Sequence, residues 1–171
     1  WENRICEIIE EMPSSTEDDI AWKLIDEMAG KAAPYLMPIF EESQGKKGRL
    51  SMQTNAKLYR NADAMVEQAK HFAEVIPNLN VKMPATAAGI RAMEEATYQG
   101  ISVNATVSFT VPQAIAVAEA VERGMKRREE EGLDVESMAP VCTIMVGRVD
   151  DWLKVVANKE NIITNQDYLE W

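Results

Sequence analysis

The chain has 171 residues, 46% of them apolar and 27% charged, a composition typical of a globular domain that excludes a disordered, collagen-like or coiled-coil chain. Its 18 Lys and Arg against 28 Asp and Glu give a formal net charge of −10, and this negative field disfavours nucleic acid and anionic membrane surfaces as partners. Uninterrupted apolar stretches fall well short of the ~18 residues that a membrane span requires, so we expect no membrane partner.

Residues 1–48 are predicted to form a helical lead-in. Ile5 and Ile8 recur at helical spacing until a proline ends the run. The hydroxyl residues 14–16, followed by three acids, indicate the start of a second helix, because a hydroxyl can cap the free amides and acids favour the positive end of the helix dipole. A further helical stretch, broken by two prolines, leads to the turn at 45–48.

Beyond this lead-in, strand patterns alternate with helix patterns, and no domain break interrupts them. The predicted strands are 49–54, 78–83, 101–109 and 140–147, and the predicted helices are 61–75, 86–99 and 112–128. Such alternation predicts parallel βαβ units, because parallel neighbours in a sheet require a crossover connection. The chain is therefore expected to be one α/β domain over residues 1–171.

Three successive predicted strands carry polar residues at every second position. Strands of a parallel sheet are normally apolar on both faces, and a polar group buried without a partner costs roughly 1 to 3 kcal/mol. We therefore expect the polar faces to line a shared interior, as in a closed barrel whose reactive end lies at the carboxyl ends of the strands. The polar positions are Ser51, Gln53, Asn55, Asn80, Lys82, Ser102, Asn104, Thr106 and Ser108.

Lys82 is the residue of this set whose side chain could form a Schiff base with a carbonyl substrate. A lysine in a strand is most often an exposed edge residue, and the pattern alone leaves that interpretation open. Its neighbours Val81, Met83 and Pro84 are apolar, however. Apolar surroundings favour the neutral amine, which is the form that adds to a carbonyl to give a Schiff base.

Three segments resemble the transaldolase family in their order and spacing. They are VKMPAT at 81–86, GISVNAT at 100–106 and TIMVGRVDDW at 143–152, and the resemblance covers roughly residues 49–152. It implies a parallel (β/α)8 TIM barrel and a class I aldolase mechanism that uses neither a metal nor an organic cofactor. It also implies a sugar-phosphate substrate and a cytoplasmic role in the pentose phosphate pathway of carbohydrate metabolism.

The same resemblance assigns three catalytic residues. Lys82 matches the lysine that attacks the ketose carbonyl, and Thr106 matches the residue that holds the catalytic water. Gln53 stands where the family usually has a glutamate that relays protons through this water. An amide can position water but cannot act as a base, so this substitution puts transaldolase activity itself in question.

Four further residues are implied to bind substrate. Asn104 and Thr143 match residues that contact the sugar, and Thr143 replaces the usual serine while it keeps the hydroxyl. Arg148 matches the arginine that binds the sugar phosphate, a role that suits the permanently charged guanidinium. Asn55 completes the set. Met145 occupies a position that is usually aromatic in the family.

The length predicts only part of a barrel, because a complete (β/α)8 barrel usually takes about 250 residues. We expect the central part, about the third to sixth strands, with the recognisable motifs in 49–152. Such a piece would expose strand edges, which predicts a homo-oligomer or missing barrel segments as partners. The alternative hypothesis is a catalytically impaired or inactive barrel fragment that acts as a structural or assembly unit.

No other site is predicted. His71 is the sole histidine and lies within a predicted helix, which makes a Ser-His-Asp triad or a histidine-rich metal site improbable. Cys6 and Cys142 are far apart in the sequence, so neither a disulfide framework nor a cysteine-based metal site is expected, and a reducing cytoplasm fits best. No metal and no cofactor is therefore expected.

Overall fold

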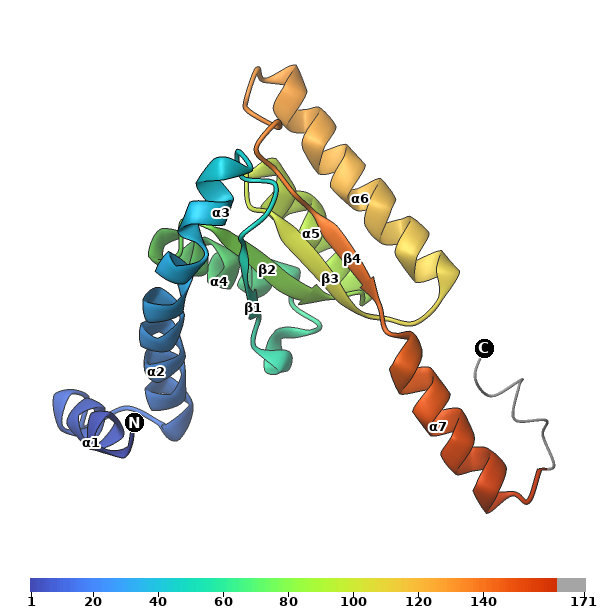
Figure 1. The fold of residues 1–171 in the computed structure, drawn as a ribbon, viewed down its shortest axis with the longest axis horizontal. Helices are drawn as coiled ribbons and strands as arrows, with labels where there is room; N and C mark the ends of the chain where they lie inside the picture. Colours follow the sequence, from blue (N-terminus) through green and yellow to red (C-terminus); the bar gives the residue numbers. More distant parts are fainter. Residues whose placement is uncertain (163–171) are drawn as a thin grey trace.

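The structure is a computed structural model, and it describes residues 1–162. Four parallel strands form one sheet in the order β1-β2-β3-β4 (Figure 1). The strands are β1 (Leu50–Gln53), β2 (Leu79–Pro84), β3 (Val103–Ser108) and β4 (Val141–Ile144). The α-helices are α1 (Glu2–Glu11), α2 (Glu17–Ala32), α3 (Met37–Glu42), α4 (Ala62–Val75), α5 (Ala87–Tyr98), α6 (Val111–Glu130) and α7 (Val146–Lys159). Two 3-10 turns, η1 (Ala33–Tyr35) and η2 (Ala56–Leu58), lie between them.

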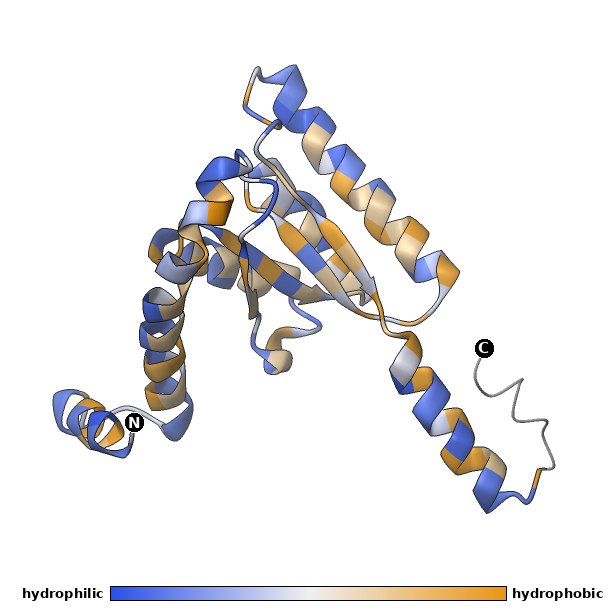
Figure 2. Ribbon diagram, in the orientation of Figure 1, coloured by the Kyte–Doolittle hydropathy of each residue, from blue (hydrophilic) through white to orange (hydrophobic). Residues whose placement is uncertain are grey.

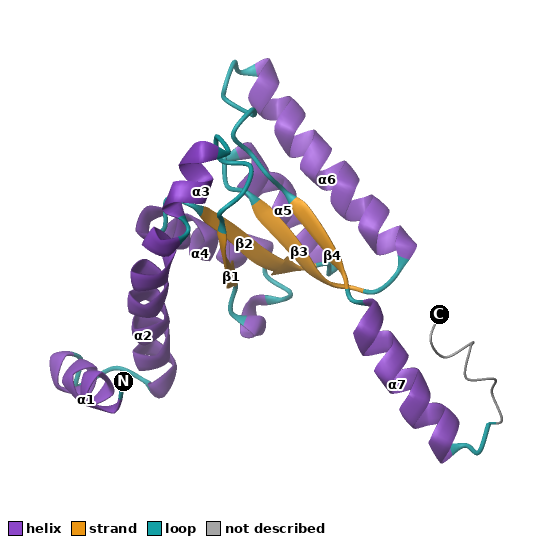
Figure 3. Ribbon diagram, viewed as in Figure 1, coloured by secondary structure: helices purple, strands orange, loops and turns teal. Residues whose placement is uncertain are grey.

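The crossover helices lie on one face of the sheet. Helix α5 packs against both α4 and α6, and all three contact the strands (Figures 1 and 3). Sequential strand order with helices on a single face is the pattern of consecutive units of a (β/α)8 barrel, whereas doubly wound sheets reverse their strand order. The prediction of an α/β fold with the parallel strands of a partial barrel is therefore confirmed.

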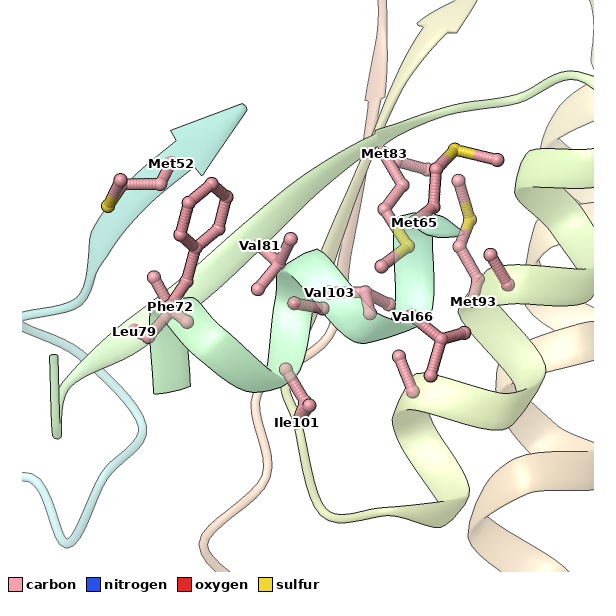
Figure 4. Close-up of a cluster of buried hydrophobic side chains, with 14 of the residues drawn as sticks. Met52, Met65, Val66, Phe72, Leu79, Val81, Met83, Met93, Ile101 and Val103 are labelled. Carbon is pink, nitrogen blue, oxygen red and sulfur yellow. The ribbon is translucent and has the colours of Figure 1, made fainter. Parts of the chain in front are cut away.

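The hydrophobic core fills the layer between the sheet and these helices. Figure 4 shows Val81 and Met83 of β2 on the side of the strand where Phe72 and Met65 of α4 lie. All four side chains are at most 1% exposed. Because successive side chains of a strand point to opposite faces, the core position of Val81 and Met83 turns Lys82 to the other face of the sheet.

Helix α2 packs beside α4, and α1 packs in turn against α2. Thr16 and Asp19 form a reciprocal capping box at the start of α2, which confirms the helix start predicted from the hydroxyl and acid pattern. The ring of Trp22 in α2 lies 5.9 Å from the ring of Phe72. Arg4 of α1 then donates two hydrogen bonds to Glu27 of α2, which fastens the first helix to the second.

The last predicted strand, 140–147, is wrong in its carboxyl half. The strand ends at Ile144, and helix α7 begins two residues later and extends away from the sheet (Figure 1). A short apolar run reads equally well as a strand or as part of a helix. Here Val146, Val149 and Leu153 recur at helical spacing. The end of the apolar run therefore belongs to helix α7, which continues into the following residues.

The placement of Ser108 on the polar face is also wrong. Val107 has a positive φ of 54°, and the β3–β4 register shifts between Ala105 and Ser108. This bulge reverses the alternation: Ser108 is fully buried, beside the Cys142 thiol at 3.8 Å, and Cys142 pairs with Ala105 of the helix-covered face.

Arg49 holds the amino end of the sheet together. Its guanidinium donates to the carbonyl oxygens of Gly45 at 2.8 Å, Leu79 at 2.7 Å and Ser137 at 2.7 Å, so it joins three separate segments. The Phe40 ring lies 5.0 Å from the guanidinium carbon. Partial burial lowers the pKa of Arg49 from its ordinary value.

We expect Arg49→Met to lower the free energy of unfolding by about 2 kcal/mol, because it keeps the apolar stem but leaves three carbonyl oxygens without their charged donor. Urea unfolding followed by circular dichroism measures this loss. Arg60→Met is the matched control, since Arg60 is exposed and stacks on Tyr59 at 5.1 Å. Equal losses in the two variants would contradict a special role for Arg49.

Candidate active site

Three predicted site residues form one row across the open face of the sheet. Gln53 of β1 pairs in register with Lys82 of β2, and Lys82 pairs with Asn104 of β3. The Gln53 amide donates to the Lys82 main-chain oxygen at 3.1 Å. Lys82 and Asn104 are half-buried, and Gln53 is exposed. Figure 2 shows hydrophilic and hydrophobic positions in alternation along β2 and β3.

The row continues to the fourth strand and toward the carboxyl ends. The Thr143 hydroxyl of β4 donates to the Asn104 side-chain oxygen at 2.9 Å. Thr106 lies two residues beyond Asn104 on the same face, where it pairs with Pro84 and is 5% exposed. Five of the seven predicted site residues therefore share one face of the sheet at its carboxyl end.

The amino-end half of this face is closed by the loop that precedes β4. The Asn80 amide donates to the Ala139 carbonyl at 3.2 Å, and the Ala139 amide donates to the Ser102 hydroxyl at 3.2 Å. Within the described chain, the buried Asn80 side-chain oxygen has no hydrogen-bond partner. The loop thus covers the polar residues below Lys82, and access to the lysine is from the carboxyl end.

The other two predicted residues lie outside this row. Asn55 follows β1, and its side-chain oxygen accepts from the Lys57 amide at 2.9 Å, which caps the turn η2. Arg148 is exposed in the first turn of α7, where it lines a groove of about 500 Å³ with Phe109 and Trp152. Because α7 directly follows β4, Arg148 lies at the carboxyl end of that strand.

Two residues at the rim of the site are absent from the sequence-predicted set. The Met145 sulfur accepts from the Val107 amide at 3.2 Å and lies 3.6 Å from the Thr106 hydroxyl. Gln113 donates through Nε2 to the Val107 carbonyl and to the Ala85 carbonyl, both at 3.1 Å. Thr-x-x-Gln at 110–113 is a capping-box pattern, and this signal in the sequence could have identified Gln113.

The positive φ of Val107 predicts that a substitution at this position will change the stability of the protein. A positive φ raises the conformational free energy of a β-branched residue by about 1 kcal/mol or more, whereas asparagine tolerates this region. Since Val107 is 42% exposed, little apolar burial is at stake. We expect Val107→Asn to raise the free energy of unfolding by up to about 1 kcal/mol. The control Val103→Asn changes a fully buried residue and should strongly lower the free energy of unfolding. A similar decrease in Val107→Asn would contradict the strained conformation of Val107.

Neither a membrane span nor a metal centre emerges from residues 1–162. In this part of the chain no helix combines the length and the apolar character needed to cross a bilayer. The same residues contain no cluster of three or more His, Cys, Asp or Glu side chains arranged to hold a metal ion.

Comparisons with known proteins agree on one family. The family model described as Transaldolase/Fructose-6-phosphate aldolase matches residues 2–170. Transaldolase 2 of Streptomyces avermitilis is 38% identical over 121 residues, which cover 70% of this chain and 32% of that protein. Transaldolase of Thermobifida fusca is 33% identical over 137 residues, or 79% of this chain and 35% of that protein.

A third relative extends the matched region. Transaldolase of Acidothermus cellulolyticus is 30% identical over 149 residues, which cover 86% of this chain and 38% of that protein. The chain thus spans about a third of the length of the curated relatives it matches.

Proposed function

Because the chain belongs to the transaldolase/fructose-6-phosphate aldolase family, we propose that it carries the Schiff-base centre of an enzyme that transfers or cleaves a dihydroxyacetone unit of a sugar phosphate. The observation that carries this proposal is the row of Gln53, Lys82 and Asn104 on adjacent strands. It sets one amine among amide and hydroxyl groups on the face that the crossover helices leave open. A cytoplasmic place in the pentose phosphate pathway is part of the same proposal.

The proposed reaction starts at the Lys82 amine. Its nitrogen adds to the C2 carbonyl carbon of the ketose, and loss of the C2 oxygen as water leaves a protonated imine. The C3–C4 bond then breaks, its electron pair moves into the imine to form an enamine, and the C4 hydroxyl loses its proton as C4 departs as an aldehyde. The enamine carbon C3 then either takes up a proton or bonds to the carbonyl carbon of a second aldehyde, whose oxygen becomes a hydroxyl, and either step regenerates the imine. Addition of water at C2 finally breaks the C–N bond and releases the product and the free Lys82 amine.

The neighbouring side chains suit the steps around this amine. Thr106 and Gln53 hold the water that carries protons to and from the C2 oxygen, and Gln53 does so as an amide, without acting as a base. Asn104 and Thr143 bind hydroxyl groups of the sugar, supported by their mutual hydrogen bond at 2.9 Å. Met145, rather than an aromatic ring, borders this water site through its contact with Thr106.

Arg148 and Asn55 complete the proposed substrate site. Arg148 lies in the first turn of α7, where the positive end of the helix dipole adds to the guanidinium charge. Both features favour a phosphate group. Asn55 stands two residues beyond Gln53 at the same end of the sheet.

The two outer strands of the sheet have open edges, which could bind further strands. Within the described residues, β1 and β4 each pair on one side only, and α7 exposes Trp152 and Leu153 to 68% and 53%. We propose that further barrel segments or a second copy of the chain cover these edges, because open strand edges and apolar faces favour association.

Reductive trapping tests the proposed function. The chain is incubated with dihydroxyacetone or fructose 6-phosphate, reduced with borohydride, and weighed intact by mass spectrometry. We expect one sugar-derived adduct per chain, and peptide mapping should locate it at Lys82. Absence of an adduct with every ketose tried would overturn the proposal and favour an inactive structural unit.

A further inference from the structure

Val107 adopts a strained backbone conformation next to a proposed catalytic residue. Its φ of 54° lies in the left-handed region, which a β-branched side chain rarely enters. Val107 directly follows Thr106, whose hydroxyl lies on the open face with Lys82. Strain of this kind persists only where the surrounding structure holds it, and it often occurs at functional sites.

Two side chains form hydrogen bonds with the backbone of this strained residue. Its amide donates to the Met145 sulfur at 3.2 Å, and its carbonyl accepts from the Gln113 amide nitrogen at 3.1 Å. The same nitrogen of Gln113 donates to the Ala85 carbonyl at 3.1 Å, directly after the strand that carries Lys82. Gln113 thereby joins the carboxyl ends of β2 and β3.

Helix capping does not account for all the hydrogen bonds of the Gln113 side chain. A capping box uses the oxygen of the side chain, and the Gln113 oxygen indeed accepts from the amides of Phe109 at 3.0 Å and Thr110 at 3.2 Å. The two hydrogen bonds from its nitrogen lie outside the capping box. They reach the ends of the two strands that hold Lys82 and Thr106.

We infer that Gln113 is a positioning residue, which holds the Val107 bulge and thereby aims the Thr106 hydroxyl at the water beside Lys82. This inference rests on the proposed function, because it assigns Gln113 a part in the formation of the Schiff base. Gln113 does not touch the substrate. Its effect passes through Val107 to Thr106, so it should alter the rate of the reaction and leave ketose binding unchanged.

Gln113→Glu separates the two roles of the side chain. Glutamate keeps the capping oxygen at the helix start but cannot donate to the carbonyls of Val107 and Ala85. We expect the rate of borohydride-trapped adduct formation at saturating dihydroxyacetone to fall about tenfold or more, since small misplacements of catalytic groups have effects of this size. The half-saturating concentration should stay within about twofold, because no substrate contact is lost.

Two controls distinguish positioning from loss of stability. Asp19→Asn alters the corresponding residue of the capping box of α2, a helix that carries no proposed site residue, and should leave the trapping rate unchanged. In a Thr106→Ala background, Gln113→Glu should have little further effect, because Gln113 acts through Thr106. Full additivity of the two substitutions, or an unchanged rate in Gln113→Glu, would overturn the inference.

Amide hydrogen exchange gives a readout that does not depend on activity. The Val107 amide should exchange at least about tenfold faster in Gln113→Glu, and also in the uncharged variant Gln113→Met, because the bulge opens more often. The Val81 amide, which donates to the Ser102 carbonyl at 2.9 Å, should not change. If the wild type forms no adduct, the proposed function fails, and unchanged Val107 exchange in both variants would separately overturn the positioning role.

Discussion

Replacement of Lys82 by alanine is expected to abolish the borohydride-trapped adduct, with a loss of at least about a thousandfold relative to the wild type. The amine is the atom that bonds to the sugar, so no neighbouring hydroxyl or amide can take its place. Intact mass spectrometry after incubation with dihydroxyacetone measures the loss directly. Lys82 is half-buried on the open face, so its removal should change the fold little.

The matched control is a lysine of the outer helices. Lys126→Ala removes an exposed amine of α6, and we expect the adduct to form at the wild-type rate. Unfolding curves should be similar for both variants, which ties the loss in Lys82→Ala to chemistry. An adduct that persists in Lys82→Ala would assign the reactive amine to another residue and remove the main support for the proposed function.

Gly89→Ala is expected to lower the free energy of unfolding by about 3 kcal/mol or more, the largest stability effect that we predict. A Cβ atom at Gly89 would lie 1.8 Å from the Pro84 carbonyl oxygen, which is a backbone atom and cannot rotate away. Pro84 ends the strand that carries Lys82, so relief of the clash must displace this strand end or the start of α5. We also expect slower adduct formation.

Gly30→Ala, also within a helix, is expected instead to raise the free energy of unfolding. Gly30 also lies within a helix, but its added Cβ would meet only Val75 Cγ1, at an ordinary 3.9 Å. Alanine is the better helix former, so this variant should gain roughly 0.5 to 1 kcal/mol. Urea unfolding of both variants measures the contrast. A Gly89→Ala protein as stable as Gly30→Ala would show that α5 does not approach Pro84 this closely.

The regular part of the fold could be predicted because it depends on local periodicity. Alternation over 78–83 and 101–106 predicted which side chains face the helices, and the register of Gln53, Lys82 and Asn104 agrees with it. Helix starts also follow local chemistry, as the capping box of Thr16 and Asp19 confirms. Two of the three family motifs, at 81–86 and 100–106, lie on or beside these regular strands, so the sequence could also predict that the proposed nucleophile and its polar neighbours share one face.

The structure of the rim of the site could not be predicted from local periodicity, because one of the contacts that shape it joins distant parts of the chain. Alternation predicted Ser108 beside Thr106, but contacts from Met145 and Gln113 hold Val107 in a bulge that turns Ser108 into the core. No local pattern encodes such a bulge, because Met145 lies 38 residues away in the sequence. For the same reason, the placement of Arg148 on a helix required the structure: an apolar run suits a strand or a helix equally, and only its packing decides between them.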